Sequence, residues 1–405
     1  MQYAEGRCLG GGSEINSGLY HRTPKAILQS WIDTFLVESL TFEDLLPYFL
    51  KCEKDLSISK LPYPAPLASL KLKQGADSLN WNCEEVPRWV KYTSNSNIVE
   101  RQTMTATFIP RALNAGTTLV DNTKVCKFKH SDKNWQIGAV QKINSQSRKI
   151  SVKTKNLFLC GGAIQTPYIL RRNGVKKNIG NTLALHVTAK VVAEFPDEVN
   201  SANMGVPVHQ VKEFAPQWSF GCSISSPIHL ANAMYDHPQY KNQILERWKH
   251  AAIYYVMITG KNNGKVRNIP GFNDPLVRCR VSTEELVNLG KGMRQLCRLL
   301  FEAGANFIYP SIFGIDRLSS AHDISLIPVP LDRNKSNLMT IHLTSSCPMG
   351  ENQRICATNS FGKVWNTENL YINDASLLCT APSVNPQGSV MAIAYRNAMK
   401  FVQNQ

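Results

Sequence analysis

The sequence lacks the patterns that mark metal-binding, disulfide-linked or membrane-spanning proteins. Its 11 cysteines are an odd number, and none of them forms a Cys-x-x-Cys pair or a His/Cys cluster with zinc spacing. The longest apolar run, residues 251–259, is closed by His250 and Lys261 and is far shorter than the roughly 18 residues of a transmembrane helix. We therefore expect reduced, mostly buried thiols, no metal site and no membrane span.

Further absences narrow the class of protein. The first residues lack the basic stretch and the apolar stretch of a secretory signal peptide, which favours a cytoplasmic location. No Gly-Lys-Ser or Gly-Lys-Thr sequence is present, which excludes a phosphate-loop nucleotide site. Residues 221–225 lack the second glycine of a hydrolase nucleophile elbow, so a hydrolase is disfavoured.

The net charge of +15 raises the question of nucleic-acid binding. The basic residues are dispersed, however, and the densest groups, in residues 124–133 and 171–177, contain no recognisable binding motif. Net charge bears on solubility and association before it bears on function. We therefore predict a solvated basic surface and no nucleic-acid partner, while a preference for anionic surfaces or anionic substrates stays open.

The chain has 405 residues, of which 43% are hydrophobic. This length exceeds the usual size of a domain with a single hydrophobic core, so we predict two lobes. The first part mixes helix and strand signals. They are a capping box at residues 41–44, an irregular proline-rich loop over 59–69, a helix over 104–115, a β-like stretch over 117–120, a hairpin series over 125–152, a strand over 156–160 and a helix over 163–172. The strand, glycine turn and helix at the end of this series would present helix N-terminal amides to a ligand.

The composition changes at about residue 190. Strand signals at 190–195, 217–226 and 251–259 precede a helix that is capped by Ser282 and keeps apolar helical spacing up to Gly304. These signals predict an inserted lobe of antiparallel sheet plus helices over residues 190–335. Turn, strand and helix signals with glycines return in residues 336–405.

The last third of the chain contains residues suited to one reaction. His342 lies in the segment 340–350, and Asn385 directly precedes Pro386. Oxidation of a carbinol needs one group that takes the hydroxyl proton and another that holds the oxygen while hydride leaves the carbon, and histidine and asparagine can do both. Pro386 predicts the start of a helix over 387–401, whose positive end would point at Asn385.

Asp374 follows a predicted strand at residues 370–372. A carboxylate there can accept hydrogen bonds from cofactor hydroxyls or cap the next turn, and the sequence leaves both readings open.

Several segments, taken in order, resemble the glucose-methanol-choline (GMC) family of flavin oxidoreductases. Residues 6–20, with the cluster Gly10-Gly-Gly-Ser13, are similar to the first signature of this family, and residues 160–170 are similar to the second. Residues 179–186 resemble a recurrent stretch that follows the second signature. The segments around His342 and over 374–385 match the C-terminal active-site and flavin-binding blocks.

The resemblance implies an α/β fold, α+β overall, with a GMC-type FAD-binding domain in residues 1–189 and 336–405 and a substrate-binding domain in residues 190–335. It implies FAD as cofactor and oxidation of CH–OH groups, with His342 as the proton acceptor, Asn385 at the same oxygen and hydride transfer to flavin N5. The other histidines considered, His186 among them, are interpreted as structural. The residues implied to bind the flavin are Gly11, Gly12, Ser13, Asn16, Leu19, Val125, Asp374, Ala375, Pro386 and Gln387.

One departure from the family affects these expectations. Family members begin with a strand, a Gly-x-Gly-x-x-Gly turn and a helix that bind the ADP part of FAD, and no such unit precedes Gly6. We therefore expect an N-terminally incomplete FAD-binding domain, and we expect the isolated chain to bind FAD poorly. The chain would then be a fragment, or half of an enzyme whose companion chain supplies the ADP-binding unit. The alternative is a degenerate member without catalysis. The substrate stays open among alcohol, polyol, sugar and sterol, as does the electron acceptor.

Overall fold

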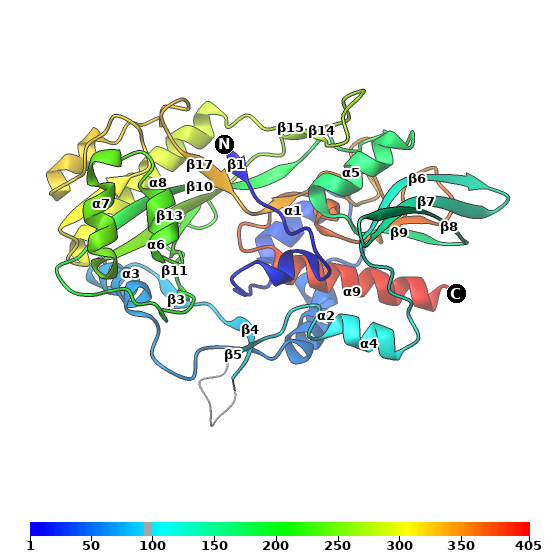
Figure 1. Cartoon of the computed structure of the whole chain (residues 1–405), viewed down its shortest axis with the longest axis horizontal. Coiled ribbons are helices and arrows are strands. Elements are labelled where there is room, and N and C mark those ends of the chain that lie inside the picture. The colour runs from blue at the N-terminus through cyan, green and yellow to red at the C-terminus, as the bar shows by residue number, and fades with distance from the viewer. Residues whose placement is uncertain (93–98) are drawn as a thin grey trace.

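A large sheet forms one end of the molecule (Figure 1). The computed structural model describes residues 1–92 and 99–405. Within that part, nine strands join in the order β1-β17-β10-β13-β12-β11-β3, with β16 and β18 also paired to β10. All pairs are antiparallel except β1 with β17. The strands are β1 (Gln2–Tyr3), β3 (Cys83–Glu85), β10 (Ala184–Glu194), β11 (His209–Val211), β12 (Trp218–Cys222), β13 (Ala251–Thr259), β16 (Phe307–Pro310), β17 (Leu338–Thr340) and β18 (Leu343–Thr344).

Helices cover both faces of this sheet, and the side chains of β10 show why. Side chains alternate between the faces of a strand, so Val191 and Ala193 pack in the apolar cluster with α3 (Leu67–Ser78) and α8 (Thr283–Glu302). Val192 packs on the other face in the cluster with α6 (Pro227–Ala233) and α7 (Pro238–Glu246). Because both faces are buried, β13 is apolar along nearly its whole length, and β10 is apolar at seven of its 11 positions.

Helix α8 forms as its sequence predicts. The Ser282 hydroxyl accepts a hydrogen bond from the Glu285 amide at 3.2 Å, and the Glu285 carboxylate accepts one from the Ser282 amide at 2.6 Å. This capping box satisfies amides that the helix itself leaves unpaired. A Cβ at Gly292 would lie 2.7 Å from a methyl carbon of Val256, so glycine allows the helix to approach β13 closely.

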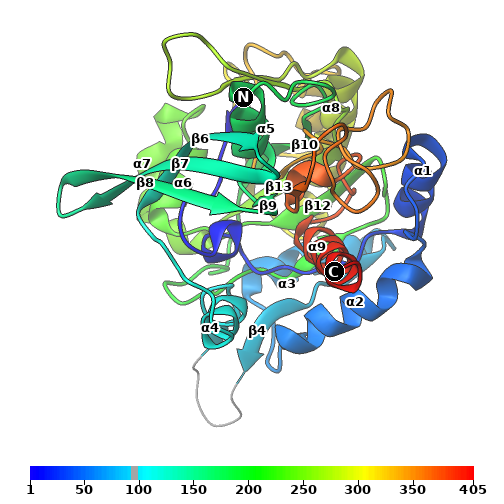
Figure 2. The same ribbon diagram turned by 90° about the vertical axis from the view of Figure 1, so that its right-hand side faces the viewer.

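The other end of the molecule is built around α9 (Gln387–Gln403), which lies beside α2 (Phe42–Asp55) in both views (Figures 1 and 2). Its buried apolar cluster also includes residues of α1 (Lys25–Phe35), α5 (Gly162–Arg172) and the parallel pair β9 (Leu157–Leu159) and β19 (Leu370–Ile372). The capping box predicted at Thr41 and Asp44 begins α2. This cluster and that of the large sheet are the two largest apolar clusters among the described residues, and the prediction of two lobes stays a prediction.

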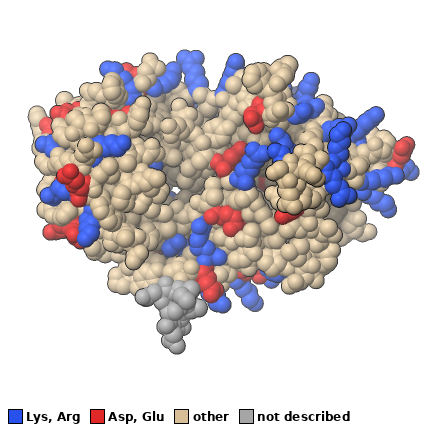
Figure 3. Space-filling model, in the orientation of Figure 1, with Lys and Arg blue, Asp and Glu red and all other residues tan. Residues whose placement is uncertain are grey.

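A three-stranded antiparallel sheet projects from this end (Figure 2). It consists of β6 (Thr123–Ser131), β7 (Asn134–Ile143) and β8 (Gln146–Thr154), which confirms the predicted hairpin series. Lys and Arg side chains gather over this sheet, whereas elsewhere on the visible face they are mixed with acidic ones (Figure 3). The predicted absence of a nucleic-acid partner stays a prediction.

The remaining elements are short. They are β2 (Ile58–Ser59), β4 (Arg88–Tyr92), β5 (Val99–Arg101), α4 (Phe108–Asn114), β14 (Lys265–Arg267), β15 (Leu276–Arg278) and the short 3-10 helices at Gly11–Glu14, Trp248–His250, Ala321–Leu326 and Ala375–Leu377. None of the helices found in the described ranges is both long enough and apolar enough to cross a membrane.

Three local predictions are wrong. The loop predicted over residues 59–69 ends early, because α3 begins at Leu67 once its capping residue Pro66 closes the proline-rich stretch. The helix predicted over 104–115 begins only at Phe108, since Pro110 has no N–H and is tolerated only in a first turn. Residues 117–120 are irregular and exposed, without a strand partner in the part of the chain that the structure covers.

The packing does not follow chain order throughout. Helix α3 lies in the range predicted as the first part of a FAD-binding domain, yet its Ala68, Leu72 and Ala76 pack in the cluster of the large sheet. The division into residues 1–189, 190–335 and 336–405 stays a prediction.

Candidate active site

The two predicted catalytic side chains converge. His342 lies in the connection between β17 and β18, which both pair with β10. The Thr340 hydroxyl donates to the His342 carbonyl at 3.1 Å and accepts from its amide at 3.2 Å, which fixes the backbone of this connection. Asn385 lies just before α9, and its Nδ2 is 3.4 Å from His342 Nε2.

His342 also contacts a second histidine. The Nδ1 atoms of His186 and His342 are 3.0 Å apart, and the two rings are nearly perpendicular at 85°. Burial, with a smaller contribution from the charge of Lys212, lowers the pKa of His342 to about 4. Burial also holds the pKa of His186 well below its usual range. Both rings are therefore neutral near pH 7, and one Nδ1 donates to the other.

The neighbours of Asn385 indicate which tautomer His342 adopts. Gln210 Nε2 donates to Asn385 Oδ1 at 3.1 Å, which directs the Asn385 amide nitrogen toward His342 Nε2. Nε2 then accepts a hydrogen bond, so the proton of His342 is on Nδ1 and is donated to His186. The arrangement leaves a basic lone pair on Nε2, the atom a proton acceptor needs.

The loop over Gly10–Asn16 lies beside the start of α9 (Figure 1). Asn16 donates to the side chain of Gln387, the first residue of α9. The Arg101 guanidinium donates to the Ser13 carbonyl at 3.0 Å, and the Ser13 hydroxyl accepts from the Met104 amide at 3.0 Å. Predicted flavin-binding residues from the two ends of the chain are thus brought together.

Glycines at this site border open space. A Cβ built at Gly11, Gly12 or Gly162 would meet no atom within 4 Å, whereas one at Gly10 would collide with the Glu14 side chain. Gly11 and Gly162 also have positive φ angles of 59° and 79°, which glycine adopts without strain. Bare backbone beside open space suits the close approach of a large planar cofactor such as a flavin.

Helix α9 adds a positive helix end to the same region. It begins at Gln387, with Pro386 at the cap position rather than at the predicted first helical position. No side chain from the described ranges caps this end by a hydrogen bond. Its first amides therefore keep their positive partial charge available for an anionic or electron-rich group.

Asp374 caps a turn and ties two segments together. Its Oδ1 accepts from the Ser376 amide at 2.8 Å, and its Oδ2 accepts from the Gly162 amide at 2.8 Å and from the Thr166 hydroxyl at 2.5 Å. Burial raises the pKa of Asp374, against these hydrogen bonds. The turn-capping reading is therefore observed, and a role toward cofactor hydroxyls stays a prediction.

The other predicted flavin-binding residues occupy varied positions. Ala375 is half-buried in the turn after Asp374, and its carbonyl accepts from the Ser345 amide at 3.1 Å. Leu19 is half-buried and bridges to Arg88. Val125 is 41% exposed on β6, in the projecting sheet. No described hydrogen bond joins Val125 to the rest of the site.

Sequence reasoning missed several polar residues of this region. Gln210 contacts Asn385, and its Nε2 also lies 3.3 Å from the Tyr255 hydroxyl. The charge of Lys212 helps to lower the pKa values of both His342 and His21, and His342 also helps to lower that of His21, so all three lie in one region. Position offered a signal for His21 alone, because it directly follows the first signature segment, whereas the strand signals found in the sequence do not include residues 210 and 212.

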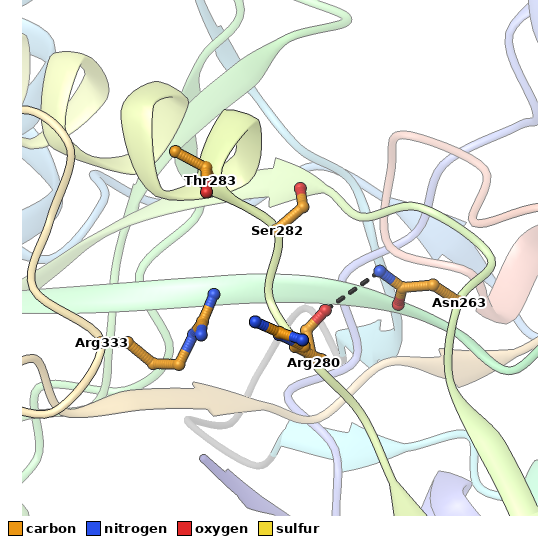
Figure 4. A pocket seen from close by; sticks show the side chains of 5 residues that line it. All are labelled: Asn263, Arg280, Ser282, Thr283 and Arg333. Atoms are coloured by element: carbon orange, nitrogen blue, oxygen red, sulfur yellow. Dashed lines mark hydrogen bonds between the residues drawn. The ribbon is translucent and has the colours of Figure 1, made fainter.

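A separate surface cavity of about 410 Å³ is lined by Asn263, Arg280, Ser282, Thr283 and Arg333 at the start of α8 (Figure 4). It contains none of the predicted site residues. In the described part of the chain, no group of three or more His, Cys, Asp or Glu side chains could hold a metal ion.

The sequence matches two models of the GMC oxidoreductase family, the N-terminal one over residues 1–188 and the C-terminal one over residues 273–394. An uncharacterised GMC-type oxidoreductase of Sinorhizobium fredii is 33% identical over 408 residues, which cover 98% of this chain and 81% of the relative. A long-chain-alcohol oxidase of Arabidopsis thaliana is 23% identical and is matched over 96% of this chain and 58% of its own length.

Solved structures show the same fold. Pyridoxine 4-oxidase from Mesorbium loti superposes with a TM-score of 0.77 at 16% identity, over 99% of this chain and 85% of that one. Formate oxidase of Aspergillus oryzae superposes with a TM-score of 0.74 at 14% identity, over 98% and 84%. At these identities the likeness concerns the fold alone, and it confirms the predicted mixture of helix and sheet.

The comparisons do not support one expectation. The N-terminal family model matches from residue 1, so an N-terminally incomplete FAD-binding domain is not shown. Nothing in the comparisons points to a companion chain that supplies an ADP-binding unit.

Proposed function

This chain belongs to the GMC oxidoreductase family, whose members bind FAD, and on that premise we propose that it oxidises a CH–OH group of a small molecule with FAD as cofactor. The observation that carries the proposal is the convergence of His342 Nε2 and Asn385 Nδ2 at 3.4 Å. These two atoms come from separate segments and contact each other, so a substrate oxygen that takes the place of this contact would reach both. The alcohol oxidase among the relatives supports the choice of substrate group.

In the proposed mechanism His342 takes the proton. Its Nε2 lone pair accepts the proton of the substrate hydroxyl, while the Asn385 amide donates to the same oxygen and holds it as the carbonyl forms. The Nδ1 proton stays in the hydrogen bond to His186, which keeps the ring oriented. FAD supplies the acceptor for the hydride that leaves the carbon.

FAD is proposed to bind at the loop over 11–19, the turn at 374–375, the start of α9 and Val125. The backbone of Gly11 and Gly12 borders the open space, with Ser13 and Leu19 in the same segment. The pair formed by Asn16 and Gln387 joins this segment to the positive end of α9. Asp374 caps the turn that begins at Ala375, and both residues are proposed to contact FAD. Val125 on β6 is proposed to contact the adenine part of FAD.

Replacement of His342 by alanine tests this function. We expect the rate of flavin reduction by an alcohol, measured anaerobically by stopped flow, to fall about 10²- to 10⁴-fold, because a general base is lost. The absorbance spectrum of bound FAD should be unchanged. The exposed histidine His322 provides the control, and His322→Ala should reduce flavin at the wild-type rate.

Unchanged flavin reduction in His342→Ala would remove the assigned base. A wild-type protein that binds FAD but is reduced by no alcohol, polyol, sugar or sterol would favour the degenerate, non-catalytic member.

A further inference from the structure

Lys212 lies beside the reacting pair with no assigned role. It follows β11 two residues after Gln210, which donates to Asn385 at 3.1 Å. Alternate residues of an extended segment point to the same side, so the Lys212 side chain lies on the Asn385 side of the sheet edge. Its ammonium nitrogen is buried and has no hydrogen-bond partner in the described ranges.

No carboxylate forms an ion pair with this lysine in the described structure. Every Asp and Glu of the chain lies outside residues 93–98 and is therefore described, and none has an oxygen within 4.0 Å of Lys212 Nζ. Burial lowers the pKa of Lys212 to about 8, and the charge of Glu84 opposes that change. The ammonium is thus mostly protonated at pH 7, although a buried charge without a partner is unfavourable.

His21 presents unpaired nitrogen atoms in the same region. Both of its ring nitrogens are buried without a well-formed hydrogen bond in the described part of the chain, although Gln210, whose Oε1 is also unpaired, lies near enough to raise the pKa of His21 slightly against burial. The nearest acid is Glu84, whose Oε1 is 3.9 Å from Nε2 and thus beyond hydrogen-bond distance. A Cβ at Gly388, three residues after Asn385, would lie 2.1 Å from the His21 carbonyl oxygen, so His21 packs against the start of α9.

Resting on the proposed function, we infer that the substrate is an alcohol that carries a carboxylate near its CH–OH group, with the Lys212 ammonium and a His21 N–H as donors to that carboxylate. The carboxylate would give the buried ammonium the counter-ion that the chain itself does not provide. It also explains the unpaired nitrogens of His21, since one ring N–H would donate to the second carboxylate oxygen.

The charge of the cluster favours a carboxylate over a phosphate. Burial and the charge of Lys212 hold the pKa of His21 well below its usual range, so this ring is neutral. One ammonium and neutral donors balance a single negative charge, whereas a phosphate monoester carries close to two at pH 7. Glu84 is about half exposed, at 49% of its side chain, and adds negative charge at the edge of the cluster.

The test compares ω-hydroxycarboxylates of two to six carbons with the uncharged primary alcohols and the phosphorylated alcohols of equal length. Turnover is measured with the FAD-loaded wild type, with Lys212→Met, which keeps the length of the side chain, and with Lys149→Met, which removes an exposed lysine of β8. Loss of one partner of a buried charge pair corresponds to about a 30-fold or larger fall in kcat/KM.

We expect the wild type to prefer the hydroxycarboxylate, and Lys212→Met to lose that preference, measured as the ratio of kcat/KM for the hydroxycarboxylate to kcat/KM for the uncharged alcohol of equal length. Lys149→Met should behave like the wild type. An equal preference in wild type and Lys212→Met would overturn the inference and leave the proposed function standing, as would a preference for the phosphorylated series.

A binding measurement separates the two proposals. Titration calorimetry of the hydroxycarboxylate into FAD-loaded wild type, His342→Ala and Lys212→Met does not depend on turnover. Binding to the first two proteins and its loss in Lys212→Met would support the inference even if no alcohol is oxidised. Absence of binding to the wild type would refute it. Thermal melting checks that Lys212→Met is folded, which we expect because removal of an unpaired buried charge does not destabilise a core.

Discussion

The ring of His186 holds the His342 tautomer that leaves Nε2 unprotonated. His186→Phe keeps a ring of similar size but removes the acceptor for the Nδ1 proton of His342. We expect kcat to fall about 10- to 100-fold, as for other residues that orient a reacting group through one hydrogen bond, with little change in KM. His186→Asn, whose side-chain oxygen can accept that proton, should recover part of the rate.

Steady-state kinetics with the FAD-loaded proteins measures the change at His186. A fall in affinity with kcat unchanged would show that His186 shapes the binding site rather than orienting the base.

Three buried histidines make the fold sensitive to acid. The pKa values of His21, His186 and His342 are all lowered by burial, that of His342 to about 4. A histidine in the unfolded chain binds a proton near pH 6.5. Between about pH 6.5 and 4 the unfolded state therefore binds more protons than the folded state, and the free energy of unfolding decreases as the pH is lowered. The His342 change alone corresponds to about 3 kcal/mol across that interval.

Urea unfolding between pH 7.5 and 5 measures this dependence. Stability should decrease toward pH 5, and His186→Phe should flatten the decrease because it removes one titrating ring. A profile that is flat in the wild type over that interval would contradict the neutral state inferred for the histidines.

At the scale of elements, the cap of α8 does two tasks. Ser282 satisfies one helix amide, whereas the buried Glu285 accepts from the Ser282 amide and also from the Lys261 amide at 2.8 Å. Ser282→Ala should destabilise the protein by about 1 kcal/mol. Glu285→Ala should cost more, about 2 to 3 kcal/mol, because two amides lose their partner.

Chemical denaturation of both variants measures the difference, with the exposed Thr283→Ala as the control. Equal losses for Ser282→Ala and Glu285→Ala would show that the contact with Lys261 contributes little.

The sequence predicted helices well where a capping box is followed by apolar residues at helical spacing. Both capping boxes, at Thr41 and Ser282, begin helices, and the apolar spacing after Ser282 continues through α8. The signals failed where proline decides the boundary, since Pro66 hid the start of α3 and Pro110 shortened α4. The effect of a proline depends on which helix position it occupies, and that position is set by packing outside the segment.

At the scale of the molecule, the sequence predicted the proposed catalytic pair better than the polar residues that surround it. His342 and Asn385 belong to segments with a recognisable family pattern, and the structure brings their side chains together. Lys212 and Gln210 reach the same place from β11, a strand whose partners lie far away in the sequence. A single sequence contains no signal for which distant strands pair, so these residues could not be predicted.

FAD should connect parts of the chain that are far apart in sequence. In the proposed site, Asn16 of the loop over 10–16 is bonded to Gln387 at the start of α9, and Gly162 of the turn at 161–162 is bonded to Asp374. A hundredfold excess of FAD over its dissociation constant stabilises the folded state by about 2.7 kcal/mol, which corresponds to about 3 °C in melting temperature for a chain of this length. Amide exchange should slow in all three segments together, because one ligand orders them.

Hydrogen–deuterium exchange with and without FAD measures these segments separately, and the start of α8, beside the cavity of Figure 4, provides an internal control that should not change. Slower exchange around Val125 in β6 would support its predicted contact with the adenine part. Protection confined to the projecting sheet, with the loop over 10–16 and α9 unchanged, would contradict the proposed flavin position. The catalytic roles proposed for His342 and Asn385 depend on that position, since Asn385 lies directly before the start of α9 and contacts His342.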